Sequence, residues 1–322
     1  MNVPVSEGAP EARGDARLRL GTCPDSWGVW FADDPLQTPW TRFLDEVAEV
    51  GYQWLELGPF GYLPSDQARL TDELARRGLR VAGGTVHGFS GLHRPGDWPD
   101  IERITRQVCE LTAAVGGRHV IFVPVPGYRD DATGAFLEPA ELDDEQWRTM
   151  VRAAGELGKI VAEEYGLRLE FHPHADSHVE TQAQTERFLG ETDPRYVSLC
   201  LDTGHLAYRH ADNVALINRY PDRIGYVHIK QMDPAIVAQA DREGLAFGQA
   251  VAMGASCEPP LGEPNVEDVA KALRTIDRGD PSRDMFVVVE QDMYPTDFSK
   301  PKPIAQRTYA YLRGLGIGEE KE

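Results

Sequence analysis

The sequence predicts a single (β/α)8 barrel of the α/β class, and three observations support this fold. Eight short β-type runs recur along the chain. The segments between them carry apolar residues at helical spacing, as at Phe43, Val47 and Val50. Glycines such as Gly51 and Gly78 stand directly before the runs, where a glycine typically ends the preceding helix. Because strands alternate with helices throughout, we expect one continuous barrel.

The strands are placed in order from these signals. The first run begins after residues 1–16, which have no apolar periodicity, and a helix-ending glycine precedes each of the next four runs. The last three runs are recognised by alternating or continuous apolar residues. The eight expected strands span residues 18–23, 52–57, 79–86, 119–125, 167–172, 196–201, 224–229 and 285–290.

The barrel is expected to fill residues 17–317, with flexible tails at 1–16 and 318–322. The segment 231–263 after the seventh strand is long for a connection and has the size of a lid. An open doubly wound sheet is the rival fold. No G-x-G-x-x-G motif opens a helix after a strand, so we favour the barrel.

Composition excludes several classes of function. The 322 residues include 33 Lys and Arg against 52 Asp and Glu, a formal net charge of −19. This charge repels phosphate backbones, so we expect no nucleic-acid partner. We find neither a membrane-spanning apolar run nor a secretion signal, and we expect no membrane partner and a cytoplasmic location. The four cysteines are scattered and predict small core residues.

Polar residues end four successive strands on the side that faces the barrel interior. Because side chains alternate along a strand, Leu167, Leu169 and Phe171 are expected to pack on helices, and the residues between them point inward. The same alternation applies to the last three strands. The inward polar residues at the four strand ends are Glu170, Asp202, His228 and Glu290. Active sites of such barrels lie at this end, so we expect these residues to share one site.

These four residues predict a site for one divalent metal ion. Three carboxylates buried together would be very costly without a cation between them. An oxygen-rich set of this kind suits Mn²⁺, which we favour, and also Co²⁺, Mg²⁺ or a catalytic Zn²⁺. The alternative is that each residue caps the helix after its strand, and Asp202 before Thr203 and Gly204 fits a cap.

Further polar side chains crowd the same end of the barrel. The candidates for proton transfer are Glu170, Glu290, His172, Lys230 and His205. His87, at the end of the third strand, and His174 are candidates for substrate contact. The alternative for the histidines and the lysine is a hydrogen bond to a metal ligand.

Two other stretches predict substrate-binding residues. Trp27 and Trp30 follow the first strand and either stack on the apolar face of a polyol ring or plug the barrel mouth. Arg242 lies in the long segment after the seventh strand and is a further candidate.

A long series of motifs resembles the xylose isomerase-like barrel superfamily of sugar isomerases and epimerases. Within it, the motifs look like those of the inosose (2-keto-myo-inositol) dehydratases. They are DDEQW at 143–147, EYGLRL at 164–169, HPH at 172–174, VET at 179–181, TDP at 192–194, LDTGH at 201–205, DRIGYVHIK at 222–230, DREG at 241–244 and VVVEQD at 287–292.

The resemblance implies a single divalent metal held by a Glu, Asp, His and Glu set, which falls on the four strand-end residues found above. It also implies proton transfer next to a ketone, with the metal holding the carbonyl and a neighbouring hydroxyl. Two residues depart from the dehydratase pattern. Glu170 stands where those enzymes have an apolar residue and matches the ketose epimerases instead, and His87 stands where an apolar or aromatic residue is expected.

Together these features predict a metal-dependent lyase that acts next to the ketone of an unphosphorylated keto-polyol through an enolate. An inosose dehydratase of inositol catabolism is the leading case. The sequence has no phosphate-binding loop, which favours an unphosphorylated substrate. The alternative is a ketose epimerase or isomerase, in which Glu170 and Glu290 transfer the proton on opposite faces of the substrate.

Two remoter alternatives are a DNA-repair endonuclease of the same superfamily and a barrel that binds a sugar or a protein partner without turnover. The acidic charge argues against the endonuclease. The resemblance also leads us to expect a homo-oligomer.

Overall fold

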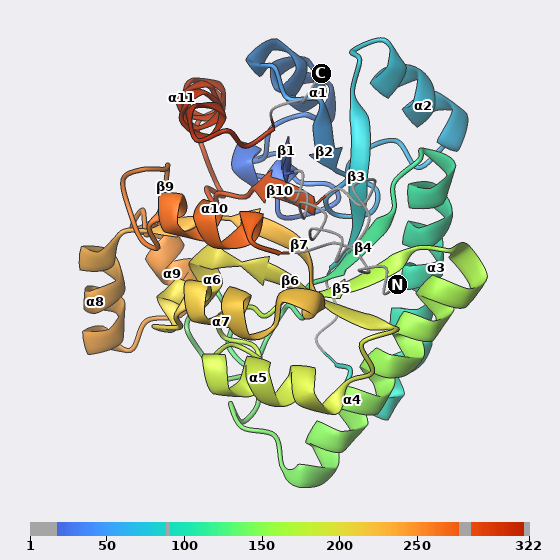
Figure 1. The fold of residues 1–322 in the computed structure, drawn as a ribbon, viewed down its shortest axis with the longest axis vertical. Helices are drawn as coiled ribbons and strands as arrows, with labels where there is room; N and C mark the ends of the chain where they lie inside the picture. Colours follow the sequence, from blue (N-terminus) through green and yellow to red (C-terminus); the bar gives the residue numbers. More distant parts are fainter. Residues whose placement is uncertain (1–17, 88–90, 277–284, 319–322) are drawn as a thin grey trace, which may run out of the picture.

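The computed structural model describes residues 18–87, 91–276 and 285–318. The eight predicted strands form a closed parallel barrel (Figure 1). Their order around the barrel is β1, β10, β7, β6, β5, β4, β3 and β2. This confirms the predicted fold class. The predicted tail at 1–16, and all but the first residue of the tail at 318–322, lie outside the described residues.

Each barrel strand lies where the sequence places it, and the ends differ by at most three residues. The largest difference is in the fourth strand, which stops at Phe122 because Pro124 and Pro126 follow and proline cannot donate to the ladder. The barrel strands are β1 (Leu18–Thr22), β2 (Trp54–Glu56), β3 (Arg80–Val86), β4 (His119–Phe122), β5 (Arg168–Phe171), β6 (Val197–Asp202), β7 (Ile224–Ile229) and β10 (Met285–Val289).

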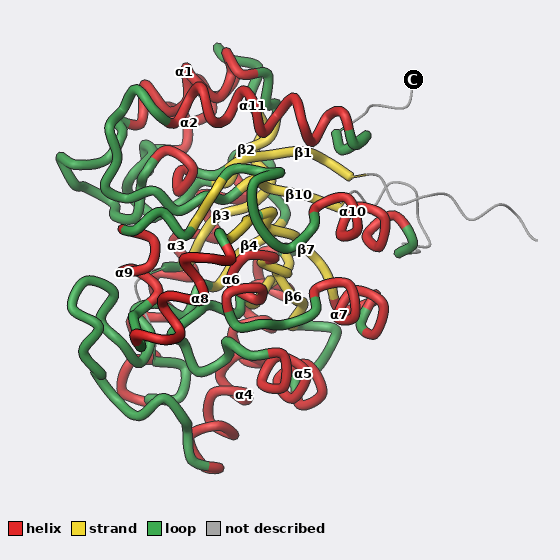
Figure 2. Tube along the Cα trace, turned by 90° about the vertical axis from the view of Figure 1, so that its left-hand side faces the viewer, coloured by secondary structure: helices red, strands yellow, loops and turns green. Residues whose placement is uncertain are grey.

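Helices surround the barrel (Figures 1 and 2). The outward residues of the strands pack against these helices. The ring of Phe171 lies 4.1 Å from that of Phe188, centroid to centroid. The helices are α1 (Trp40–Val50), α2 (Gln67–Ala75), α3 (Trp98–Ala114), α4 (Asp144–Lys159), α5 (Gln182–Glu191), α6 (Thr203–Tyr208), α7 (Asn213–Arg219), α8 (Pro234–Glu243), α9 (Phe247–Ala252), α10 (Val266–Arg274) and α11 (Pro301–Gly314). None of the described helices is long and apolar enough to cross a membrane.

The barrel interior is filled by the other face of the strands. Cys200, Tyr226 and Val288 belong to one buried cluster inside the barrel, two residues before Asp202, His228 and Glu290 respectively. The predicted alternation is therefore confirmed for these strands. All four cysteines are free, and Cys23, Cys109 and Cys200 are buried, as expected of core residues.

The segment after β7 is a small substructure. It contains α8, α9 and a two-stranded antiparallel sheet of β8 (Gln231–Met232) and β9 (Ser256–Cys257). Figure 2 shows α8 and α9 on the side of the barrel where the strands have their carboxyl ends. The Phe247 amide at the start of α9 donates to Asp176 Oδ2 at 2.6 Å, which holds the segment against the loop after β5.

Candidate active site

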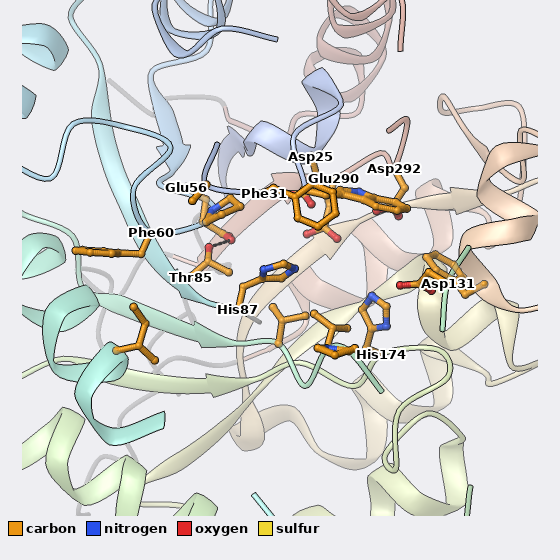
Figure 3. Close-up of a pocket in the computed structure, with 18 residues that line it drawn as sticks. Asp25, Phe31, Glu56, Phe60, Thr85, His87, Asp131, His174, Glu290 and Asp292 are labelled. Atoms are coloured by element: carbon orange, nitrogen blue, oxygen red, sulfur yellow. Dashed lines mark hydrogen bonds between the residues drawn. The ribbon is translucent and has the colours of Figure 1, made fainter. Parts of the chain in front are cut away.

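A cavity of about 480 Å³ opens at the carboxyl ends of the barrel strands (Figure 3). Of the residues that the sequence predicts for the site, Trp30, His87, His174 and Glu290 line this cavity. Its other polar lining residues are Asp25, Glu56, Thr85, Asp131 and Asp292. Five carboxyl groups therefore face one space, while no Lys or Arg is found among the described residues that line it.

Buried donor atoms converge beside Glu290. His172 Nε2 lies 3.3 Å from Asp202 Oδ2, and His228 Nδ1 lies 3.7 Å from the same oxygen and 2.5 Å from Glu290 Oε2. His172, Asp202, His205 and Glu290 have ligand atoms that all lie within 4.8 Å of one another. The structure thus brings together three of the four predicted metal ligands, Asp202, His228 and Glu290, and adds His172.

Several of these atoms have no hydrogen-bond partner among the described residues. They are both ring nitrogens of His172, Asp202 Oδ2 and His228 Nδ1. Unpaired polar atoms are costly inside a protein unless another group satisfies them. A mixed set of imidazole nitrogens and carboxylate oxygens that point at one another fits a divalent cation.

Asp202 combines the two roles that the sequence left open. Its Oδ1 accepts hydrogen bonds from the amides of Gly204 and His205 at 2.8 and 2.7 Å, so the residue caps α6. Its Oδ2 points toward His172. The cap fixes the carboxylate and leaves Oδ2 facing His172, with Lys230 Nζ 3.4 Å away.

The structure does not bring Glu170 into this group. In the sheet, Glu170 pairs with Ser198, four residues before Asp202, so it lies deeper in the barrel. Its Oε1 is 2.8 Å from His119 Nδ1. Its Oε2 packs against Gly225, where a Cβ would lie only 2.1 Å from this oxygen. His172 points inward from the same strand, two residues nearer the cavity. The ligand set proposed below therefore contains His172 in place of Glu170.

A buried chain of hydrogen bonds orients His228. Thr85 Oγ1 donates to Glu56 Oε1 at 2.6 Å, and Glu56 Oε2 is 2.9 Å from His228 Nε2. Glu56 Oε2 therefore accepts a hydrogen bond from Nε2, and Nδ1 faces Asp202 and Glu290. This is the arrangement of a carboxylate that orients a metal-binding histidine.

Lys230 lies fully buried on the other side of Glu290. Its Nζ is 2.6 Å from Glu290 Oε1, 2.6 Å from Asp292 Oδ2 and 2.9 Å from His205 Nε2. Burial lowers the pKa of Lys230, but the surrounding carboxylates outweigh it and raise the pKa well above its ordinary value. Gly204 is needed here because a Cβ would lie 2.3 Å from Lys230 Cγ. The amine is thus a fixed positive charge behind the cavity wall.

Several titratable groups of the cavity wall have shifted pKa values. Burial, together with the charges of Glu290 and Asp292, raises the pKa of Asp25 well above its ordinary value. Burial raises the pKa of Asp131 to about 6 and lowers that of His87 to about 4. Figure 3 shows Asp25 and Glu290 on one side of the cavity and His87 and His174 on the other.

Two predicted substrate residues lie away from the cavity. Trp27 is fully buried, donates from Nε1 to Glu46 Oε2 at 2.9 Å and packs edge-on against Phe43. It is a packing residue against α1 and fills neither of the two expected roles. Arg242 is exposed near the end of α8 and is not among the lining residues.

Sequence reasoning missed five polar residues of the cavity. Glu56 is the clearest case, because it ends β2 with the inward parity that identified the other strand ends. Asp292 lies two residues past Glu290 and carries the same signal. Asp25 lies in a short 3₁₀ helix (Pro24–Trp27), Asp131 lies in a loop and Thr85 is an ordinary strand residue, so the pattern gives no sign of their role.

The chain is similar in sequence to known proteins. A sequence model of the family described as Xylose isomerase-like TIM barrel matches residues 44–292. An inosose dehydratase of Bacillus velezensis is 32% identical over 278 residues, 83% of this chain and 89% of the relative. An inosose dehydratase of Halalkalibacterium halodurans is 29% identical over 296 residues, 89% of this chain and 93% of the relative.

Solved structures show the same fold. The IolI protein with a bound zinc atom gives a TM-score of 0.71 at 15% identity, covering 95% of this chain and 100% of that one. An L-ribulose 3-epimerase gives a TM-score of 0.66 at 20% identity, covering 93% of this chain and 94% of that one.

Proposed function

The chain belongs to the xylose isomerase-like TIM barrel family, and from this premise we propose that it is a metal-dependent lyase that dehydrates inosose or a similar neutral keto-polyol. The observation that carries this proposal is the convergence of imidazole and carboxylate atoms without hydrogen-bond partners beside the cavity. Within the part of the chain that the structure describes, five carboxyl groups and no Lys or Arg line this cavity. The similarity to inosose dehydratases over most of the chain supports the same reaction.

The proposed ligands of the divalent ion are His172, Asp202, His228 and Glu290. Bound there, the ion supplies the electrophile that stabilises an enolate next to the substrate ketone. The chain fixes the ligands in advance, through the α6 cap on Asp202 and through Glu56 on His228. We favour Mn²⁺ for this oxygen-containing set, and Zn²⁺ or Co²⁺ suits the two imidazoles.

The cavity wall supplies the proton-transfer groups of a dehydration. A carbon-bound hydrogen next to the ketone leaves as a proton, the neighbouring carbon–oxygen bond breaks, and the hydroxyl departs as water. Asp25 is the candidate acid because burial and the neighbouring carboxylates raise its pKa. Asp131, with a pKa of about 6, suits the base at neutral pH. Lys230 stays charged behind Glu290 and Asp292 and fixes both carboxylates.

The ketose epimerase alternative is less well supported. In that version, Glu170 and Glu290 act from opposite faces of the substrate. Glu170 pairs with His119 inside the barrel and does not line the cavity. An epimerase would therefore need a different second group.

A single assay tests the proposal. The metal-loaded protein is incubated with 2-keto-myo-inositol in D₂O, beside a chelator-treated control, and followed by NMR. Loss of water with formation of a dehydrated diketone supports the lyase. Deuterium uptake next to the carbonyl without elimination would favour the epimerase, and no reaction in either sample would favour a binding barrel. A cytoplasmic location and a homo-oligomer remain predictions.

A further inference from the structure

A second group of ligand-type side chains lies outside the proposed active site. His93, Glu138 and His178 come from the loops after β3, β4 and β5. Glu138 Oε2 is 3.1 Å from His93 Nε2, and Glu138 Oε1 is 3.0 Å from His178 Nε2. Both imidazoles are buried. None of the three residues lines the cavity, so the proposed reaction leaves them without a role.

The hydrogen bonds of His178 fix the position of its lone pair. Its Nδ1 lies 3.0 Å from the carbonyl oxygen of Ala140, which can only accept, so Nδ1 carries the hydrogen. In the neutral ring, Nε2 then presents a lone pair to Glu138 Oε1, which also has only lone pairs. These two atoms repel at 3.0 Å unless a cation lies between them. A ring with one nitrogen on a backbone carbonyl and the other free is typical of metal-binding histidines.

His93 supplies the second imidazole. Its ring lies 4.7 Å from that of His178, centroid to centroid, at an angle of 80°. Its Nε2 faces Glu138, and its Nδ1 is buried without a hydrogen-bond partner among the described residues.

We propose that His93, Glu138 and His178 form a second transition-metal site, of the kind that binds Zn²⁺. Two imidazole nitrogens and a carboxylate form a common zinc ligand set. Ligands at 2.0 to 2.1 Å from a tetrahedral ion lie about 3.3 Å apart, close to the 3.0 and 3.1 Å found here. An ion at this position would link the loops after β3, β4 and β5. The first two of these loops also contain His87 and Asp131, which line the cavity.

Arg94 competes with the metal for Glu138. Its Nη2 lies 2.6 Å from Glu138 Oε1, and its side chain is 43% exposed. It also has a second partner, Asp97 Oδ2, at 3.4 Å. Because the guanidinium already neutralises Glu138, we expect the site to bind metal more weakly with Arg94 in place. Arg94→Ala should therefore bind the ion at least several-fold more tightly.

The test counts metal ions per chain. Chelator-treated protein is titrated with Zn²⁺ by calorimetry and with Co²⁺ by visible absorption. We expect two equivalents for the wild type and one each for His178→Gln and Glu138→Gln, with circular dichroism confirming that both variants fold. Asp202→Asn, which alters the proposed active site, should lose the other equivalent and keep this one.

The outcomes separate the two sites. If the wild type, His178→Gln and Glu138→Gln all bind the same number of ions, the second site does not exist, whatever Asp202→Asn shows. A protonated His178 ring that persists in NMR spectra at saturating Zn²⁺ would also overturn the proposal, because the proton would then be the cation between His178 and Glu138.

Discussion

His172 and Glu170 offer the sharpest test of a single residue. His172 Nε2 faces Asp202 Oδ2, whereas Glu170 pairs with His119. We expect His172→Ala to lose bound divalent metal and to lower turnover by at least about 100-fold, since even outer partners of a metal site contribute 10- to 100-fold. Glu170→Gln is the matched control and should keep its metal. Metal analysis of both purified variants tests this prediction. Loss of metal in Glu170→Gln but not in His172→Ala would show that Glu170 is the ligand.

Glu56 is a second residue-level test, because it acts through His228. Glu56→Gln replaces the carboxylate that accepts from His228 Nε2. We expect metal affinity to fall about 10- to 100-fold while the fold is retained. Thr85→Val removes the hydroxyl that holds Glu56 and should cause a smaller loss of the same kind. Competition with a chelator measures both affinities, and unchanged affinity in Glu56→Gln would show that Glu56 does not orient the ligand.

Parity along a strand predicts the face on which a residue lies but not its depth in the barrel. Asp202 and His228 lie at the same depth because they pair directly with each other. Glu170 shares their inward face, yet it pairs with Ser198 and lies too deep. The depth depends on how neighbouring strands are staggered, including an irregularity between Leu199 and Cys200 that no sequence pattern reveals.

At the scale of elements, periodicity predicts the barrel strands well and the segment 231–263 poorly. Strands β8 and β9 have two residues each, too few to show alternation. Helix α8 did carry signals, since Asp233 caps it before Pro234 and Gly244 ends it. The sequence predicts only a long connection with the size of a lid here, because most elements of the segment are too short to show a periodicity.

The contact between Asp131 and α9 gives a prediction about stability. Asp131 Oδ1 accepts from the Gly248 amide at 3.2 Å, and burial raises the pKa of Asp131 to about 6. A carboxyl whose pKa is raised on folding adds nothing below about pH 4 and destabilises the folded state above about pH 6. Ionisation of Asp131 therefore costs about 2 to 3 kcal/mol at neutral pH.

Asp131→Asn keeps the acceptor and removes the charge. We expect its free energy of unfolding to exceed that of the wild type by up to about 2 to 3 kcal/mol at pH 7.5 and to match it near pH 4. Urea unfolding at several pH values measures the difference. A constant difference across this range would show that ionisation of Asp131 is not the cause.

At the scale of the whole molecule, the sequence was most informative. The fold and the family are confirmed by the closed barrel and the match over residues 44–292, and an inosose dehydratase is 32% identical over 83% of the chain. These conclusions rest on patterns repeated along the chain, so a local error in one strand does not change them. The native metal and the exact substrate depend on a few atoms in the cavity and remain predictions.

At this scale, the negative charge of the molecule and of its cavity favours a neutral substrate. The chain carries a net charge of −19, and the cavity has five carboxyl groups with Lys230 hidden behind two of them. An anionic substrate is therefore repelled both during approach and inside the cavity. A neutral keto-polyol meets neither barrier.

We therefore expect kcat/KM for neutral inosose to be nearly independent of ionic strength between about 10 and 300 mM salt. For a phosphorylated or carboxylated analogue, kcat/KM should be at least about 100-fold lower at low salt and should rise as salt shortens the Debye length from about 30 to below 8 Å. Steady-state kinetics across this range measure both values. Efficient turnover of the anionic analogue at low salt would show that a cationic group reaches the cavity, contrary to the arrangement of Lys230 behind Glu290 and Asp292.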